Sequence, residues 1–181
     1  MTIRTLAAAA AAFALSVSAP ALAELPTGAR APDFAASGAL AGKPFSFKLQ
    51  QALKKGPVVL YFYPKAFTQG CTLEAHAFAE ATAQFKAAGA TVIGMSNDDV
   101  ATLQKFSTEA CRDKFAVASA SPAVIKAYDV DLRKPDGSST GLTKRTSYVI
   151  ARNGKIVMVH SDMDYRDHVK MTLAAVRKLK G

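Results

Sequence analysis

The sequence has only two cysteines, Cys71 and Cys111, and it has no tryptophan. Two thiols are too few for a disulfide-dense scaffold or a four-thiolate zinc site. There is no period of helical-repeat length or collagen type, which excludes repeat arrays and rods. No phosphate-binding glycine loop or dinucleotide fingerprint is present either. The 181 residues, 50% of them hydrophobic, predict one globular domain with extensions.

Acidic residues are also scarce, with 14 Asp and Glu against 23 Lys and Arg, a formal net charge of +9. Such an excess is typical of nucleic-acid binding when the basic residues cluster. Here they form short, separate groups, such as residues 54–55 and 133–134, with acidic residues between them. We therefore interpret the charge as a solvated basic surface and predict no nucleic-acid partner.

The first 23 residues have the pattern of a secretory signal peptide. Arg4 is their only charge, residues 5–23 are rich in alanine, and Ala21 and Ala23 provide the small-x-small site of a signal peptidase. A membrane anchor is the alternative, but the stretch has few large apolar residues and contains Pro20. We predict cleavage before Glu24, a domain spanning residues 24–181, export to a bacterial periplasm, and no membrane association.

Hydrophobic periodicity predicts alternating strands and helices in the exported part. Residues 24–56 are rich in proline and glycine and predict an extended lead-in with one short strand near 45–47. The expected elements are strands at 57–63, 91–96 and 115–118, helices at 71–88, 100–111 and 122–128, a hairpin of 146–150 with 155–160, and a helix at 165–179. The polar segment 131–144 is expected to be a loop. This order predicts an α/β fold with a central mixed sheet and helices on both faces, as in the thioredoxin-type fold.

Cys71 is the residue that carries the strongest chemical signal. It follows the expected buried strand and the loop PKAFTQG, and it lies in the first turn of the next helix. Unpaired N–H groups and the helix dipole stabilise a thiolate at such a position. A buried structural cysteine or a plain structural disulfide is the alternative that position alone leaves open.

The segment YPKAFTQGCTLE at residues 63–74 resembles the active-site segment of the peroxiredoxins, whose PxxxTxxC signature is matched by Pro64, Thr68 and Cys71. The wider string PVVLYFYPKAFTQGCTLEA is similar to the bacterioferritin-comigratory, or PrxQ, branch of the AhpC/TSA superfamily. The resemblance runs from GARAPDF at residues 28–34 to residues 145–156. It implies a thioredoxin-like fold and a thiol-dependent peroxidase without a metal or organic cofactor.

The resemblance also implies roles for five residues. Cys71 attacks the peroxide and becomes a sulfenic acid, and Arg145 supplies the fixed cation that this reaction needs. Thr68 is expected to donate its hydroxyl to the thiolate and the peroxide, and Pro64 to close the pocket without adding an N–H donor. For Glu74 three interpretations stay open: it orients the arginine, caps the helix, or is solvated.

The sequence departs from the commonest PrxQ arrangement, in which a resolving cysteine lies five residues after the first. That position holds His76, which we interpret as a helix-surface residue. Within this chain the resolving role then falls on Cys111, with a one-cysteine mechanism and an external thiol as the alternative. The expected partners are a peroxide substrate and a periplasmic thioredoxin-like reductant. The protein is expected to be a monomer or a weak homodimer.

Other functions fit the sequence less well. A thioredoxin-like disulfide oxidoreductase uses CxxC, but Thr72, Leu73 and Glu74 follow Cys71. A redox sensor or binding module on the same fold remains open. His160 and His168, with acidic residues between them, do not have the spacing of a helical zinc pair, and a solvated loop is expected there.

Overall fold

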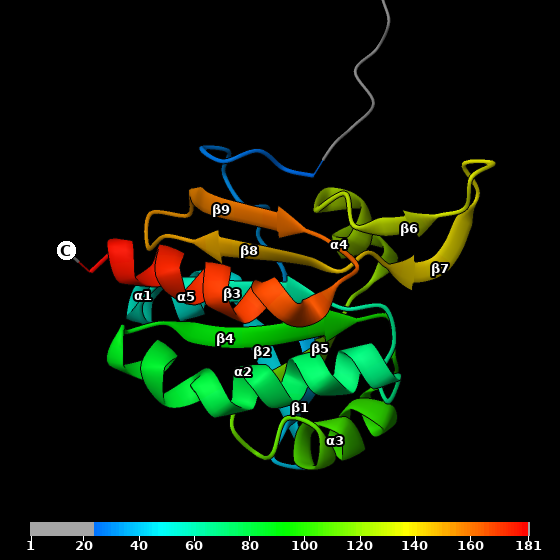
Figure 1. Cartoon of the computed structure of the whole chain (residues 1–181), viewed down its shortest axis with the longest axis horizontal. Coiled ribbons are helices and arrows are strands. Elements are labelled where there is room, and N and C mark those ends of the chain that lie inside the picture. Colours follow the sequence, from blue (N-terminus) through cyan, green and yellow to red (C-terminus); the bar gives the residue numbers. More distant parts are fainter. Residues whose placement is uncertain (1–23, 181) are drawn as a thin grey trace, which may run out of the picture.

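The computed structural model describes residues 24–180, so the signal-peptide prediction for residues 1–23 lies outside the described residues. A seven-stranded sheet of order β2-β1-β5-β4-β3-β8-β9 forms its centre (Figure 1). Its strands are β1 (Ala35–Leu40), β2 (Lys43–Lys48), β3 (Val58–Phe62), β4 (Thr91–Ser96), β5 (Ala116–Ser119), β8 (Thr146–Ile150) and β9 (Ile156–Ser161). The β3–β4 and β4–β5 pairs are parallel, and the other pairs are antiparallel. The predicted mixed sheet is confirmed.

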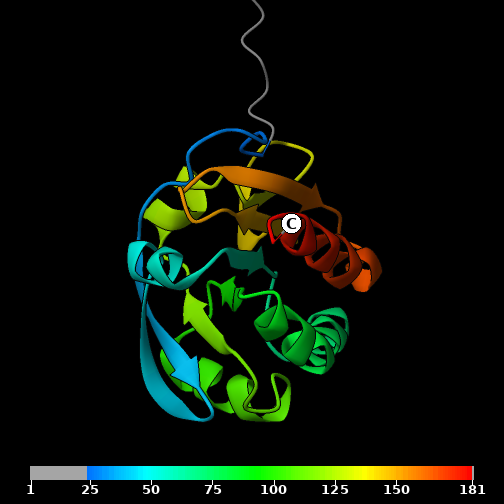
Figure 2. The same ribbon diagram turned by 90° about the vertical axis from the view of Figure 1, so that its left-hand side faces the viewer.

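Helices cover both faces of this sheet. They are α1 (Leu49–Lys55), α2 (Gln69–Ala87), α3 (Val100–Glu109), α4 (Pro122–Ala127) and α5 (His168–Lys178), the last preceded by a short 3-10 helix, η1 (Tyr165–Asp167). Figure 2 shows α2 and α5 on one side of the sheet and α1 on the other. None of the helices in the described part of the chain is both long and apolar enough to cross a membrane.

Strand β3 is an inner strand of the sheet, paired with β4 and β8, and all five of its residues are buried. Side chains alternate across a strand, so consecutive residues of β3 enter different cores. Val59 and Tyr61 join the apolar cluster with α2, α3 and α5, whereas Leu60 and Phe62 join the cluster with α1 and α4. The continuous apolar run that predicted a strand covered on both faces has this cause.

The lead-in holds more regular structure than predicted. Strands β1 and β2 form a hairpin and α1 follows directly, where the sequence predicted one short strand. Ala41 and Gly42 make its turn with positive φ angles of 50° and 72°. Strand β1 is fixed by pairing with β5, which is distant in sequence, so the local pattern gave little sign of it.

Residues 131–144 are not a simple loop, and that prediction was wrong. They form a separate two-stranded ribbon, β6 (Asp131–Arg133) with β7 (Ser139–Thr143), drawn at the upper right of Figure 1. Neither strand has a buried apolar residue, so they lack the apolar alternation by which a half-buried strand is recognised. Asp131 accepts a hydrogen bond from the Ser139 hydroxyl at 2.5 Å, which ties the two strands together.

Candidate active site

The candidate site lies where β3 leads into α2. The loop of residues 63–68 brings the chain to the start of α2, and Cys71 is the third residue of that helix with 1% of its surface exposed. Asp98 fixes this loop, because its Oδ2 accepts a hydrogen bond from the Ala66 backbone at 2.7 Å and another from the Ser96 hydroxyl at 2.7 Å. The loop is therefore anchored to the end of the neighbouring strand β4.

Asp98 was not singled out from the sequence. The next residue, Asp99, caps α3, because its carboxylate accepts a hydrogen bond from the Thr102 backbone at 2.7 Å. The adjacent Asp98 instead points to the loop that precedes Cys71. A carboxylate directly after a buried parallel strand was the available signal, since such strand ends line ligand sites in α/β sheets.

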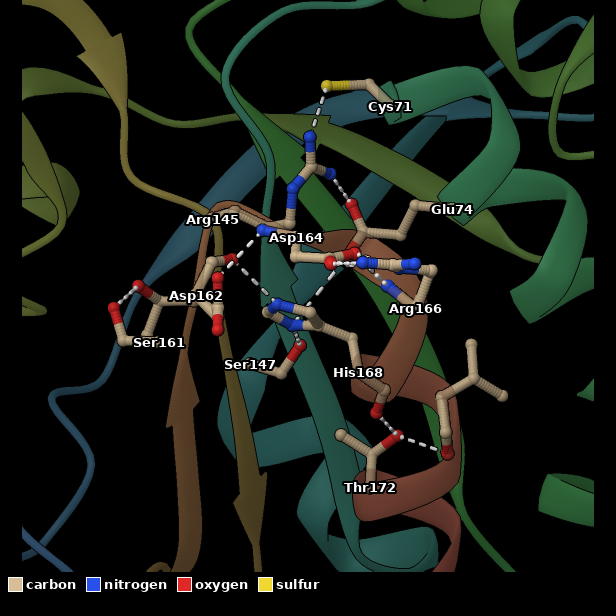
Figure 3. Close-up of polar contacts among 12 residues, drawn as sticks. Cys71, Glu74, Arg145, Ser147, Ser161, Asp162, Asp164, Arg166, His168 and Thr172 are labelled. Carbon is tan, nitrogen blue, oxygen red and sulfur yellow. Dashed lines mark hydrogen bonds and ion pairs between the residues drawn. The ribbon is translucent and has the colours of Figure 1, made fainter. Parts of the chain in front are cut away.

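Arg145 lies against Cys71, held between β8 and the loop after β9. Its Nη2 is 3.5 Å from Cys71 Sγ, its Nε donates to the Met163 carbonyl at 3.0 Å, and its Nη1 forms an ion pair with Glu74 Oε2 (Figure 3). Only 4% of the residue is exposed. Burial opposes its charge, but Glu74 and Cys71 outweigh burial and raise the pKa of Arg145. A permanent cation is thus fixed beside the sulfur.

Glu74 is fully buried one turn after Cys71, which excludes the solvated side chain among the three interpretations, and no cap hydrogen bond from a side chain is present at the start of α2. Its ion pair with Arg145 corresponds to the first interpretation, a residue that orients the guanidinium. Burial raises the pKa of Glu74, and the attraction of Arg145 opposes this shift by favouring the carboxylate. The carboxyl group therefore depends on Arg145 for its negative charge.

Gly70 gives Arg145 room to approach the helix, a role that sequence reasoning missed. A Cβ atom at this position would lie 3.2 Å from Arg145 Nη2, closer than ordinary van der Waals contact. Glycine is poor for helix formation, so its place in the first turn of α2 was the available signal. Its absence of a side chain lets the guanidinium and the helix start meet.

Thr68 and Pro64 lie in the loop before Cys71, at different depths. Pro64 is half-buried directly after Tyr63, and Thr68 is exposed at the N-cap of α2. The Thr68 hydroxyl donates to the Lys65 carbonyl at 2.9 Å. The expected donation to the sulfur is absent from this conformation, because the hydroxyl closes the turn within its own loop.

Cys111 was predicted to end a helix of residues 100–111. The helix α3 ends at Glu109, and Cys111 lies in the turn that follows it. It is fully buried, and both cysteines are free thiols that belong to the same apolar cluster. Burial, with a smaller contribution from Asp113, raises the pKa of Cys111 far above that of a free thiol. The chain therefore has one sulfur beside a cation and one in apolar surroundings.

The histidines also occupy distinct environments. His76 is half-buried on α2, whereas His168, expected in a solvated loop, is completely buried at the start of α5. The helix places it against β8, where its ring bonds to Ser147. Among residues 24–180, no group of three or more His, Cys, Asp or Glu side chains is arranged to hold a metal ion.

The fold and the site together define a thioredoxin-like domain with a cysteine at a helix start and a buried arginine–glutamate pair beside it. Residues 27–159 match the AhpC/TSA family. The chain belongs to this family, which confirms the resemblance found in the sequence.

Individual relatives support this family assignment. Peroxiredoxin Q of Suaeda salsa chloroplasts is 34% identical over 127 residues, which are 70% of this chain but 58% of that protein, so this chain spans little more than half of its length. The structure of peroxidoxin BcpB from Mycobacterium tuberculosis superposes with a TM-score of 0.74 at 31% identity, over 86% of this chain and 98% of that one. A structure of the Xanthomonas campestris bacterioferritin comigratory protein, described with its alkyl peroxide reduction activity, gives 0.69 at 27% identity, over 81% and 92%.

Proposed function

We propose that this protein is a thiol-dependent peroxidase that reduces hydrogen peroxide and organic hydroperoxides with Cys71 as the nucleophile. The observation that carries this proposal is the 3.5 Å approach of Arg145 Nη2 to the Cys71 sulfur at the start of a helix. Membership of the AhpC/TSA family supports the reaction. The alkyl peroxide reduction described for the Xanthomonas campestris relative supports organic hydroperoxides among the substrates.

In the first step the Cys71 thiolate attacks the terminal oxygen of the hydroperoxide. A sulfur–oxygen bond forms and the oxygen–oxygen bond breaks, so the sulfur is oxidised to a sulfenic acid while the peroxide is reduced. The departing oxygen takes up a proton and leaves as an alcohol, or as water from hydrogen peroxide. Negative charge moves from sulfur to that oxygen, and the guanidinium of Arg145 is close enough to stabilise it throughout.

In the second step the Cys111 thiol attacks the sulfenic sulfur, water leaves, and a Cys71–Cys111 disulfide forms. An external dithiol, for which we propose a periplasmic thioredoxin-like protein, then reduces the disulfide. Because Cys111 is fully buried, the turn that follows α3 must open first. Arg112 and Asp113, the next two residues, have φ angles of 51° and 59°, a conformation unfavourable for non-glycine residues that supports opening at this point.

Stopped-flow oxidation of the wild type, Cys71→Ser and Cys111→Ser by hydrogen peroxide and by an alkyl hydroperoxide tests the proposal. We expect Cys71→Ser to lose the reaction and Cys111→Ser to keep its first step. Peptide mass spectrometry after one equivalent of peroxide is expected to find the Cys71–Cys111 disulfide in the wild type. A normal peroxidase rate in Cys71→Ser would exclude this function.

Two other outcomes would change the mechanism. A stable Cys71 sulfenic acid with Cys111 still free would replace the disulfide route by a one-cysteine mechanism. A slow wild type that holds a partner tightly would favour a redox sensor.

The compartment and the oligomeric state are part of the proposal. The sequence of residues 1–23 supports export to the periplasm, where we propose that the protein acts as a monomer or weak homodimer. Intact mass measured on protein from a periplasmic extract is expected to correspond to a chain that starts at Glu24. Light scattering of the reduced and oxidised forms tests the oligomeric state, and a tight oligomer would contradict it.

A further inference from the structure

His168 is a buried titratable residue to which the peroxidase mechanism gives no role. It begins α5 and none of its surface is exposed. Its Nε2 lies 2.9 Å from the Asp162 carbonyl and its Nδ1 lies 2.8 Å from the Ser147 hydroxyl. Figure 3 shows the ring between Ser147 and the carboxyl group of Glu74. The ring therefore lies directly behind the Glu74–Arg145 pair.

The two hydrogen bonds assign the protons of the ring. A carbonyl oxygen can only accept, so Nε2 must carry the hydrogen that is directed at Asp162. In a neutral ring Nδ1 is then unprotonated and accepts the Ser147 hydroxyl. The neutral form of His168 thus has both nitrogens satisfied and no hydrogen left to donate to Glu74.

Glu74 faces this ring with its second oxygen. Its Oε2 pairs with Arg145, while its Oε1 lies 3.7 Å from His168 Nδ1 and has no hydrogen-bond partner among residues 24–180. A neutral imidazole closes the space behind the carboxyl group without competing for it. Arg145 is consequently the one side chain in the described part of the chain that donates to Glu74.

A second connection runs through the backbone after β9. His168 holds the carbonyl of Asp162, and the carbonyl of the next residue, Met163, accepts from Arg145 Nε at 3.0 Å. The Asp162 N–H also donates to the Arg145 carbonyl at 3.2 Å. The ring therefore stabilises the segment that supports the guanidinium on the side away from Glu74.

We propose that His168 is a positioning residue of the thiol site: its neutral ring keeps the Glu74 carboxyl group on Arg145, and its protonation loosens the contact of Arg145 with Cys71. This role rests on the proposed function, because it is defined by the reactivity of the Cys71 sulfur. A proton on Nδ1 would place a positive charge 3.7 Å from Glu74 Oε1 and attract that carboxyl group away from Arg145. The imidazolium would also repel Arg145.

The charged groups that face His168 set the pH range of this change. These charged and titratable groups come from α2, the residue before β8, β9 and the segment before α5, and they are Glu74, Arg145, His160, Asp162, Asp164 and Arg166. Burial lowers the pKa of His168 to about 4, helped by His160 and Arg145, while Asp162 opposes the shift. The ring is neutral near pH 7, and protonation begins on the acid side.

The test uses His168→Gln, with His76→Gln on α2 as the matched control. A glutamine amide can keep the bond to the Asp162 carbonyl, but it has no nitrogen that titrates beside Glu74. The rate of Cys71 alkylation by iodoacetamide and the rate of its oxidation by hydrogen peroxide are both measured between about pH 8 and pH 4. Circular dichroism at each pH confirms that the variants remain folded.

We expect Cys71 of His168→Gln to be alkylated and oxidised about tenfold more slowly than Cys71 of the wild type at pH 7. Losses of this size are typical when a residue that orients a reactive group is replaced. This deficit should shrink toward pH 4, because only the wild type then acquires a charged ring. His76→Gln should match the wild type at every pH. An unchanged rate, or a deficit that stays constant with pH in folded protein, would overturn the proposal.

Ser147→Ala provides a second variant that keeps the ring and decides the question even if His168→Gln does not fold. Loss of the donated hydroxyl removes a bond that favours the neutral ring, so the pKa of His168, followed by NMR of its ring protons, should rise. The fall in Cys71 reactivity should move to higher pH by the same amount. A shifted pKa with an unshifted reactivity profile would overturn the proposal.

The two readouts separate this inference from the proposed function. If the protein is not a peroxidase, the wild type fails to react rapidly with peroxide. The pH-dependent effect of His168→Gln on alkylation would persist in that case.

Discussion

The two cysteines of this chain are both buried, but their surroundings differ in charge. Cys71 lies at the start of α2 with a guanidinium nitrogen 3.5 Å from its sulfur. Cys111 lies in the turn after α3, where burial and Asp113 raise the pKa of its thiol. Because burial is common to both thiols, we expect the fixed cation and the helix start beside Cys71 to make the difference in their reactivity.

The largest expected difference is in alkylation. In the reduced, folded protein we expect iodoacetamide to modify Cys71 at least about 100-fold faster than Cys111, since Cys111 reacts only when its turn opens. Peptide mass spectrometry over time measures both rates in one sample. The denatured protein is the control, in which the two rates should converge. Similar rates in the folded protein would contradict the comparison.

Removing the cation should lower the reactivity of Cys71 toward that of Cys111. We expect Arg145→Met to slow oxidation of Cys71 by hydrogen peroxide by about 10²–10³-fold, the range typical for loss of one donor to a developing negative charge. Because this variant leaves Glu74 buried without its partner, Arg145→Met/Glu74→Gln is the matched control for folding. Stopped-flow rates that remain near wild type in the folded double variant would refute the role of the guanidinium.

Removing the partner of the cation should have a smaller effect. Glu74→Gln keeps the shape of the side chain but removes the charge that orients Arg145, so we expect an oxidation rate about 10-fold lower. Arg145 keeps its bond to the Met163 carbonyl, which limits the loss. Glu80→Gln, on the exposed side of the same helix, removes the partner of Arg112 and should leave the rate unchanged. Equal effects of the two variants would argue against a specific role for Glu74.

The smallest predicted effect concerns Gly70. Its replacement by alanine places a Cβ about 3.2 Å from Arg145 Nη2, so we expect a loss of roughly 3-fold in the oxidation rate. The free energy of unfolding should not fall, since alanine is a better helix former than glycine by about 1 kcal/mol. Gln69→Ala, at the exposed position before it, serves as the control. A rate that falls only together with stability would assign Gly70 a purely structural role.

Local sequence patterns predicted most elements of the fold. The run at residues 57–63 became β3, and the helical spacing after Cys71 became α2. The β1–β2 hairpin and the β6–β7 ribbon were missed for different reasons: β1 depends on its pairing with β5, and the ribbon is too exposed to show apolar alternation. The final helix was predicted, but its first residue, His168, was placed in solvent.

By itself, the sequence determined that Cys71 stands at the start of a helix after a buried strand, because strand period, loop and helix start are all local features. Only the tertiary structure decided which charges meet the sulfur. Arg145 reaches it across 74 positions, and the same packing buries Glu74 and sets His168 behind the pair. Local periodicity shows which face of an element is apolar, but the burial of a polar residue depends on partners from distant segments that satisfy it.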